Sequence, residues 1–205
     1  MLRFENLCKS FGPKSVLRNL SGHFTHGAFA LRGPNGIGKS TLLAVLSGAL
    51  EPDSGAVWID QHSLRDAPVA ARSRLAYAPD ECPVYPYMTG RELLAFVAFA
   101  RRCALASEVL ALVSRFGLDH HLDTRCGDMS LGTQKKLMLA AAWIGEPCVM
   151  LFDEPSNGLD AAARLVLIEL LCARSAANVV LVSTHDHDFA QAIGASVIEF
   201  DSLRR

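Results

Sequence analysis

Residues 33–40 read Gly-Pro-Asn-Gly-Ile-Gly-Lys-Ser and match the phosphate-loop pattern G-x-x-x-x-G-K-[S/T] at every position. A strand-like run, 28–32, precedes the loop and helical spacing follows it, which is the context that this motif needs. Loop amides and a helix N-terminus attract anions, Lys39 adds a full positive charge, and the Ser40 hydroxyl can ligate magnesium. We therefore predict a nucleoside-triphosphate site formed by Gly33, Pro34, Asn35, Gly36, Ile37, Gly38, Lys39, Ser40 and Thr41.

Runs of strand-forming residues alternate with turns and helices on both sides of the middle of the chain. We expect strands over 2–7, 16–24, 28–32, 56–60 and 75–78, and a helix over 40–50. Residues 149–152 and 179–182 are unbroken apolar runs, typical of central parallel strands that are covered on both faces. A helix over 161–173 lies between them. The pattern predicts an α/β fold with a parallel sheet.

The middle of the chain, about 82–145, is expected to be helical, with helices over 91–102, 107–116 and 131–145. It opens with a proline-rich loop, after which Thr89 and Glu92 have the spacing of a helix capping box. We therefore predict one domain over 1–205. Its core spans about 1–81 and 146–205, and a helical subdomain over about 82–145 is inserted into that core.

Two acids, Asp153 and Glu154, follow the apolar run 149–152. Ligands of open α/β sheets bind beyond the carboxyl ends of the strands, so Asp153 is expected to hold Mg²⁺ and Glu154 to polarise the attacking water. A solvated turn is the alternative. His185 follows the next apolar run, on the same rim, where it can sense the γ-phosphate. A binuclear metal motif would need an acid at position 189, which is Phe189.

Composition narrows the function classes further. The chain has 20 Lys and Arg against 21 Asp and Glu, a net charge of −1, which argues against a basic surface for nucleic acid. No apolar run reaches the roughly 18–20 residues of a membrane helix, and Glu5 stands where a signal peptide would be apolar. The six cysteines are widely spaced, so we expect reduced thiols in a cytoplasmic protein: Cys8, Cys82, Cys103, Cys126, Cys148 and Cys172.

Taken in order, these motifs resemble the ATP-binding subunit of bacterial ATP-binding-cassette (ABC) transporters. Besides the phosphate loop, residues 151–155 match the acidic strand motif, 156–160 match the loop that crosses the dimer, and His185 matches the switch histidine. Residues 129–133 align with the LSGGQ signature of that family. The resemblance implies a RecA-like P-loop NTPase core, an N-terminal antiparallel β-subdomain, an inserted helical subdomain, and ATP with Mg²⁺ as ligands.

The resemblance also implies a head-to-tail dimer, either a homodimer or a pair with a similar cassette. The signature residues Ser130, Leu131, Gly132 and Thr133 would act across the dimer, where Ser130 and Gly132 of one subunit would face the γ-phosphate held by Lys39 of the other. A helix that begins after Ser130 offers its first amides as a second anion site. Asp160 would lie in the loop at the dimer contact. Phe11 falls where the family stacks an aromatic ring on adenine, and the alternative is a core phenylalanine.

Two positions depart from the family pattern. Asp80 stands where the family has a glutamine that touches magnesium and the membrane partner, so Asp80 joins Ser40 and Asp153 as a candidate metal ligand. A carboxylate accepts hydrogen bonds but cannot donate them as an amide does. In the signature, Leu131 replaces a glycine and Thr133 replaces a glutamine.

The resemblance implies an ATPase that drives a separate integral membrane permease, with export favoured over import. The chain would be cytoplasmic and would reach the inner face of the cell membrane through that partner. The segment 82–88, with Tyr85, Tyr87 and Met88, is the expected docking surface, and an ordinary proline-rich connection is the alternative. A soluble ABC ATPase that acts on ribosomes or nucleic acid is the second hypothesis, although no nucleic-acid partner is expected.

Overall fold

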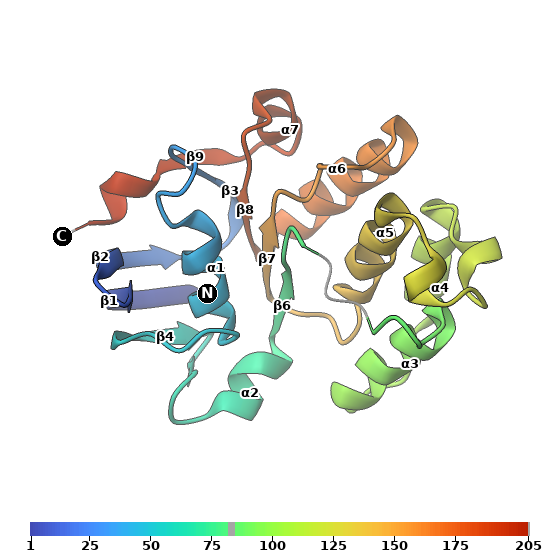
Figure 1. Ribbon diagram of the computed structural model, residues 1–205, viewed down its shortest axis with the longest axis horizontal. Helices are drawn as coiled ribbons and strands as arrows, with labels where there is room; N and C mark the ends of the chain where they lie inside the picture. The colour runs from blue at the N-terminus through green and yellow to red at the C-terminus, as the bar shows by residue number, and fades with distance from the viewer. Residues whose placement is uncertain (82–84, 205) are drawn as a thin grey trace.

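The computed structural model describes residues 1–81 and 85–204, and its elements lie in layers (Figure 1). An antiparallel sheet has the strand order β2-β1-β4-β5, and a parallel sheet has the order β6-β7-β8-β3-β9. The first sheet comprises β1 (Leu2–Phe11), β2 (Lys14–Phe24), β4 (Ser54–Ile59) and β5 (His62–Ser63). The second comprises β3 (Gly27–Arg32), β6 (Leu75–Ala78), β7 (Val149–Asp153), β8 (Val179–Ser183) and β9 (Ser196–Glu199).

Helices cover both faces of the parallel sheet, as an all-parallel sheet requires. Helix α1 (Lys39–Ser47) lies between the two sheets, and α6 (Ala161–Ser175) packs on β8 and β3 (Figure 1). A lobe beyond the sheet holds α3 (Gly90–Ala100), α4 (Ser107–Arg115) and α5 (Leu131–Ala141). Two shorter helices, α2 (Pro68–Ser73) and α7 (His187–Ala192), complete the α-helices of the described chain.

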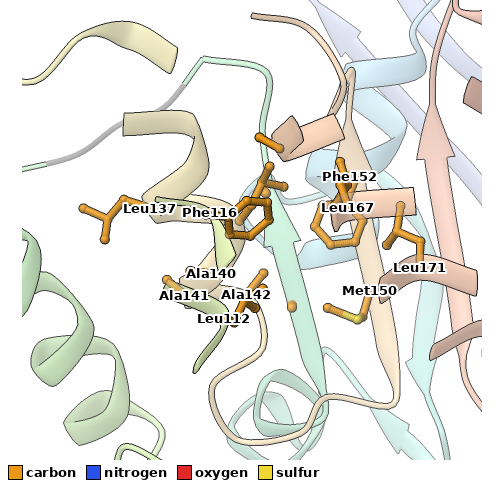
Figure 2. Packing of buried hydrophobic residues seen from close by; sticks show 14 of the residues in the cluster. Leu112, Phe116, Leu137, Ala140, Ala141, Ala142, Met150, Phe152, Leu167 and Leu171 are labelled. Carbon is orange, nitrogen blue, oxygen red and sulfur yellow. The ribbon is translucent and has the colours of Figure 1, made fainter. Parts of the chain in front are cut away.

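The central strands separate two hydrophobic clusters because successive side chains point to opposite faces. Val149 and Leu151 of β7 pack with the cluster that includes α1 and β1. Met150 and Phe152 pack with the cluster of the helical lobe, where Phe116 and Leu167 join them (Figure 2). Both faces of β7 are therefore buried, which explains its unbroken apolar sequence and confirms the predicted parallel strand.

The helix boundaries show where the sequence predictions were correct and where they were not. Thr89 and Glu92 form the predicted capping box. The helix expected over 131–145 ends at Ala141, since 142–145 are turns that close on Gly145, at φ +76°. The helix expected over 40–50 ends at Ser47, because Gly48 adopts φ +73° and its N–H bonds the Val45 carbonyl. Over the part of the chain that the structure describes, no helix is long and apolar enough to span a bilayer.

Candidate nucleotide site

Parallel pairing brings the carboxyl ends of four strands to one edge of the sheet. Asp153 of β7 pairs with Ser183 of β8, and Leu31 of β3 pairs with the same serine. On the other side, Ala78 of β6 pairs with Phe152. The phosphate loop, Asp80, the acidic pair and His185 all follow these positions directly in sequence. Residues separated by more than a hundred positions therefore emerge together at this edge.

A cleft of about 740 Å³ opens at this edge. Eleven of the residues predicted for the site line it: Phe11, Asn35, Gly36, Gly38, Lys39, Ser40, Thr41, Asp80, Asp153, Glu154 and His185. Three loop residues, Gly33, Pro34 and Ile37, are not among the lining residues. Lys14 and Val16 also line the cleft and stand in no motif of the sequence, and Asn157 of the loop 156–160 lines it too.

The phosphate loop is held by its lysine and shaped by its glycines. The Lys39 ammonium donates to the carbonyls of Gly33 and Pro34, with N–O distances of 2.7 and 3.2 Å, and lies 3.2 Å from Nε2 of His185. Gly38 precedes α1 at φ +119°, and a Cβ there would lie 2.9 Å from Val16 Cγ1. Both the backbone conformation and the contact with β2 require glycine at this position.

The acidic pair is fixed by the end of β8. The hydroxyl of Ser183, which is fully buried, donates to the carboxylate of Asp153. Glu154 has φ +44°, an uncommon conformation for a non-glycine residue, and its N–H donates to the Ser183 carbonyl at 3.0 Å. Ser183 therefore orients both acids, a role that its place at the end of an apolar run did not reveal.

Glu154 and His185 contact one another at the rim of the cleft. The His185 backbone N–H donates to Oε2 of Glu154 at 3.3 Å, and the ring Nε2 lies 3.6 Å from Oε1. Burial raises the pKa of the Glu154 carboxyl, and the hydrogen bond and charge of His185 oppose that shift. A carboxylate with a raised pKa beside a phosphate loop is suited to accept a proton from water.

The donor set suits magnesium that arrives with a nucleotide. Ser40 offers a hydroxyl, and Asp153 and Asp80 offer carboxylates, all of them lining the same cleft. Over the described residues, no group of three or more His, Cys, Asp or Glu side chains could hold a metal. Mg²⁺ is typically bound by one or two carboxylates together with substrate phosphates, so this set fits the ion.

Phe11 lies at the mouth of the cleft, beside the turn that joins β1 to β2. The residue is 51% exposed, which excludes the alternative of a core phenylalanine. Asp53 accepts hydrogen bonds from the backbone N–H of Ser10 and from Lys9 Nζ, at 2.7 and 2.9 Å. These contacts fix the end of β1 and so the position of Phe11. The Phe11 ring is thereby placed where a base could stack on it.

The signature residues lie apart from this cleft. Ser130 caps α5, accepting from the Thr133 N–H at 3.2 Å, and none of the residues 130–133 lines the cleft of its own chain. Leu131 is 81% exposed. A Cβ on Gly132 would lie 2.9 Å from the Gly158 carbonyl oxygen, so a glycine permits close contact with the loop that precedes α6.

Asp160 caps α6 by accepting from the Ala163 N–H at 2.9 Å. It also forms an ion pair with Lys136 of α5. The hydrogen bond with Lys136 lowers the pKa of the Asp160 carboxyl. Like the signature, Asp160 does not line the cleft, and it links the loop before α6 to the signature helix.

Comparison with known proteins agrees with this arrangement. The family model described as "ABC transporter" matches residues 17–157. Nod factor export ATP-binding protein I of Paraburkholderia xenovorans (strain LB400) is 33% identical over 199 residues, which cover 94% of this chain but 65% of the relative. The chain thus spans about 65% of the length of that relative.

Two solved structures share the fold. One, described as "Structure of ATP binding subunit of ABC transporter", has a TM-score of 0.87 and 29% identity, covering 97% of this chain and 85% of its own. The other is a dimeric cassette, MJ0796, bound to ADP and Pi in a post-hydrolysis state. It has a TM-score of 0.83 and 23% identity, covering 97% of this chain and 94% of its own. These likenesses confirm the predicted P-loop NTPase fold with its antiparallel and helical parts.

Proposed function

The chain belongs to the ABC transporter family of ATP-binding cassettes, and from that membership we propose that it is an ATP-hydrolysing subunit that powers a separate membrane permease. The observation that carries this proposal is the convergence of Lys39, Asp153, Glu154 and His185 on one cleft beside a phosphate loop. We also propose that residues of about 1–81 and 146–205 form its ATP-binding core and that about 82–145 form its helical subdomain.

In this proposal, the predicted side chains of the cleft bind different parts of the nucleotide and its metal ion. Lys39 and the loop amides bind the β- and γ-phosphates. The N-terminus of α1 also favours these anions. Ser40, Asp153 and Asp80 would hold Mg²⁺, which would offset phosphate charge when bound. Phe11 stacks on the base.

Glu154 performs the proton transfer of hydrolysis. Its carboxylate accepts a proton as the water oxygen bonds to phosphorus and the bond from phosphorus to the bridging oxygen of ADP breaks. His185 lies within hydrogen-bond distance of Lys39 and beside Glu154, a position that supports contact with both the γ-phosphate and the water. ATP hydrolysis thus depends on two side chains from the ends of adjacent strands.

We propose that the ATP state is a head-to-tail dimer. The signature residues do not line the cleft of their own chain, while the Ser130 end of α5 provides the amides of a helix N-terminus, which favour anions. A second chain would bring that end to the γ-phosphate. The MJ0796 cassette is dimeric with ADP and Pi, which supports a dimer for the shared fold.

The solution mass of a Glu154→Gln variant tests this function directly. The variant keeps the shape of the side chain but removes the proton acceptor, so MgATP is expected to persist and give a dimer, whereas MgADP gives a monomer. Glu108→Gln changes an exposed residue of α4 and serves as the matched control, with normal hydrolysis. Equal masses of the Glu154→Gln variant in both nucleotides, with ATP bound, would count against ATP-driven dimerisation.

We propose that aromatic side chains before and on α3 form the permease-docking surface. Tyr85 packs edge-to-face on Phe96 with ring centroids 5.7 Å apart, while Tyr87 and Phe99 are each more than 80% exposed. The first part of the expected docking segment, 82–84, lies outside the described residues. Tyr87→Asp is expected to abolish co-purification with the permease while ATP hydrolysis persists, and unchanged co-purification would exclude this surface.

We propose export as the direction of transport, at the inner face of the cell membrane. The support is the name of a relative at 33% identity, a Nod factor export ATP-binding protein, which also favours transport over action on ribosomes or nucleic acid. Inside-out vesicles that hold this chain with its permease should accumulate substrate when MgATP is supplied outside. ATP-dependent loss of preloaded substrate from those vesicles would indicate import.

A further inference from the structure

Lys135 of α5 is a charged residue that is almost fully buried. Its side chain is 6% exposed, although lysine is rarely buried without a partner. The neighbouring Lys136 keeps 19% of its side chain exposed and pairs instead with Asp160. A buried ammonium group needs hydrogen-bond acceptors, so the groups that accept from Lys135 indicate its role.

Among the residues that the structure describes, the acceptors of Lys135 lie at the end of β7 and just beyond the end of β6, beside the cleft. Its ammonium donates to the backbone carbonyl and to Oδ1 of Asp80, both at 3.1 Å, and to the backbone carbonyl of Asp153 at 3.5 Å. These three bonds use the three donors of an ammonium group. One side chain from the helical lobe therefore joins the end of β6 to the end of β7.

The pairing of the Asp80 carboxylate with this cation has an electrostatic reason. Asp80 lines the same cleft as Asp153 and Glu154, so three carboxylates surround a place proposed to receive a polyphosphate. Like charges at short range repel, and a neighbouring cation offsets that repulsion. Lys39 is engaged with the phosphate loop, and Lys135 is the cation that forms an ion pair with Asp80 over the described part of the chain.

We propose that Lys135 is a positioning residue that fixes Asp80 at the cleft and offsets part of its charge, so that the carboxylate is held where Mg²⁺ would bind beside the phosphates. The proposal rests on the proposed nucleotide function. It has a mechanical consequence as well. Because Lys135 lies on the helix that begins after Ser130, the ion pair ties the signature helix to the cleft of its own chain.

A suppression experiment on the full-length chain tests the pair. Lys135→Met removes the ammonium charge but keeps an unbranched side chain. We expect this variant to bind MgATP about tenfold more weakly, which is a typical coupling between linked sites. Asp80→Gln removes the unpaired carboxylate, so adding it to Lys135→Met should restore the affinity to within about twofold of Asp80→Gln alone. Lys136→Met is the matched control and should leave the affinity unchanged.

The readouts are MgATP affinity by calorimetric titration and, without nucleotide, the melting temperature. If Lys135→Met alone fails to fold, recovery of a folded protein by the added Asp80→Gln supports the pair, and failure of the double variant to fold overturns it. A double variant that binds MgATP about tenfold more weakly than Asp80→Gln alone would also overturn it, because packing alone would then explain Lys135. A wild-type chain that binds no MgATP would instead refute the proposed function.

Discussion

Removing the ring of Phe11 should weaken nucleotide binding without affecting the phosphate loop. The side chain lies at the mouth of the cleft, half exposed, with Lys9 Nζ 5.8 Å from the ring centroid. Stacking of a base on an aromatic side chain contributes about 1–3 kcal/mol. Since Phe11 stands at the rim and half of it faces solvent, the lower part of that range applies, about 1–1.5 kcal/mol.

That free energy corresponds to a loss of affinity of about five- to twelvefold. We expect Phe11→Ala to show this loss in calorimetric titrations with MgATP, and an equal loss with MgGTP, because every base has a stacking face. Magnesium tripolyphosphate lacks a base, so its affinity should not change. Phe99→Ala, which truncates an exposed phenylalanine of α3 outside the cleft, is the matched control.

Two results would refute this reasoning in different ways. Unchanged MgATP affinity in Phe11→Ala would mean that the base does not stack on this ring. An equal loss with tripolyphosphate would mean that the substitution disturbs the phosphate loop through the β1–β2 turn rather than removing a base contact.

Two further predictions concern stability and thiol reactivity. Asp160→Ala removes the N-cap of α6 and should cost about 1 kcal/mol, lowering the melting temperature by about 2–4 °C. Asp160→Asn keeps a capping oxygen and loses the charge paired with Lys136, so it should lower the melting temperature by less. A hydrogen bond with Lys136 lowers the pKa of the Asp160 carboxyl. The stabilisation from the Asp160 charge should therefore be lost only as the pH falls below the ordinary aspartate range, which melting temperatures measured at acid pH can show. Iodoacetamide at pH 8 should alkylate the exposed Cys172 in the native protein, whereas Cys126, whose pKa burial raises, should react only after unfolding. Modification of Cys126 in the native protein, detected by peptide mass spectrometry, would contradict its burial.

The residues of the cleft could be predicted where they stand in a short sequence motif. The phosphate loop is contiguous, and the acidic pair follows an apolar run, so each was identified without knowledge of its neighbours. Placing them together required one further rule, that parallel strands end at a common edge. The pairing of Asp153 with Ser183 fulfils that rule.

Residues that act through tertiary contacts gave no such pattern. Lys135 stands in a polar run, Gln134-Lys135-Lys136, which resembles a solvated helix face, yet it is buried against two strand ends. Strand β9 was missed because its four residues are mostly exposed at the sheet edge and do not alternate. Helix α2 is one short element of six residues, too brief for a helical period to be recognised.

Helix α5 connects the two halves of the proposed site within one chain. Its first residues carry the signature, where Ser130 caps the helix and Leu131 is exposed. One turn later, Lys135 donates to Asp80 and to the carbonyl of Asp153. The signature therefore cannot move relative to its own cleft without stretching these bonds. In a head-to-tail pair, the cleft of each chain would bind one nucleotide and the signature of the same chain would contact the γ-phosphate of the nucleotide bound by its partner. Helix α5 would thus couple the two nucleotide sites.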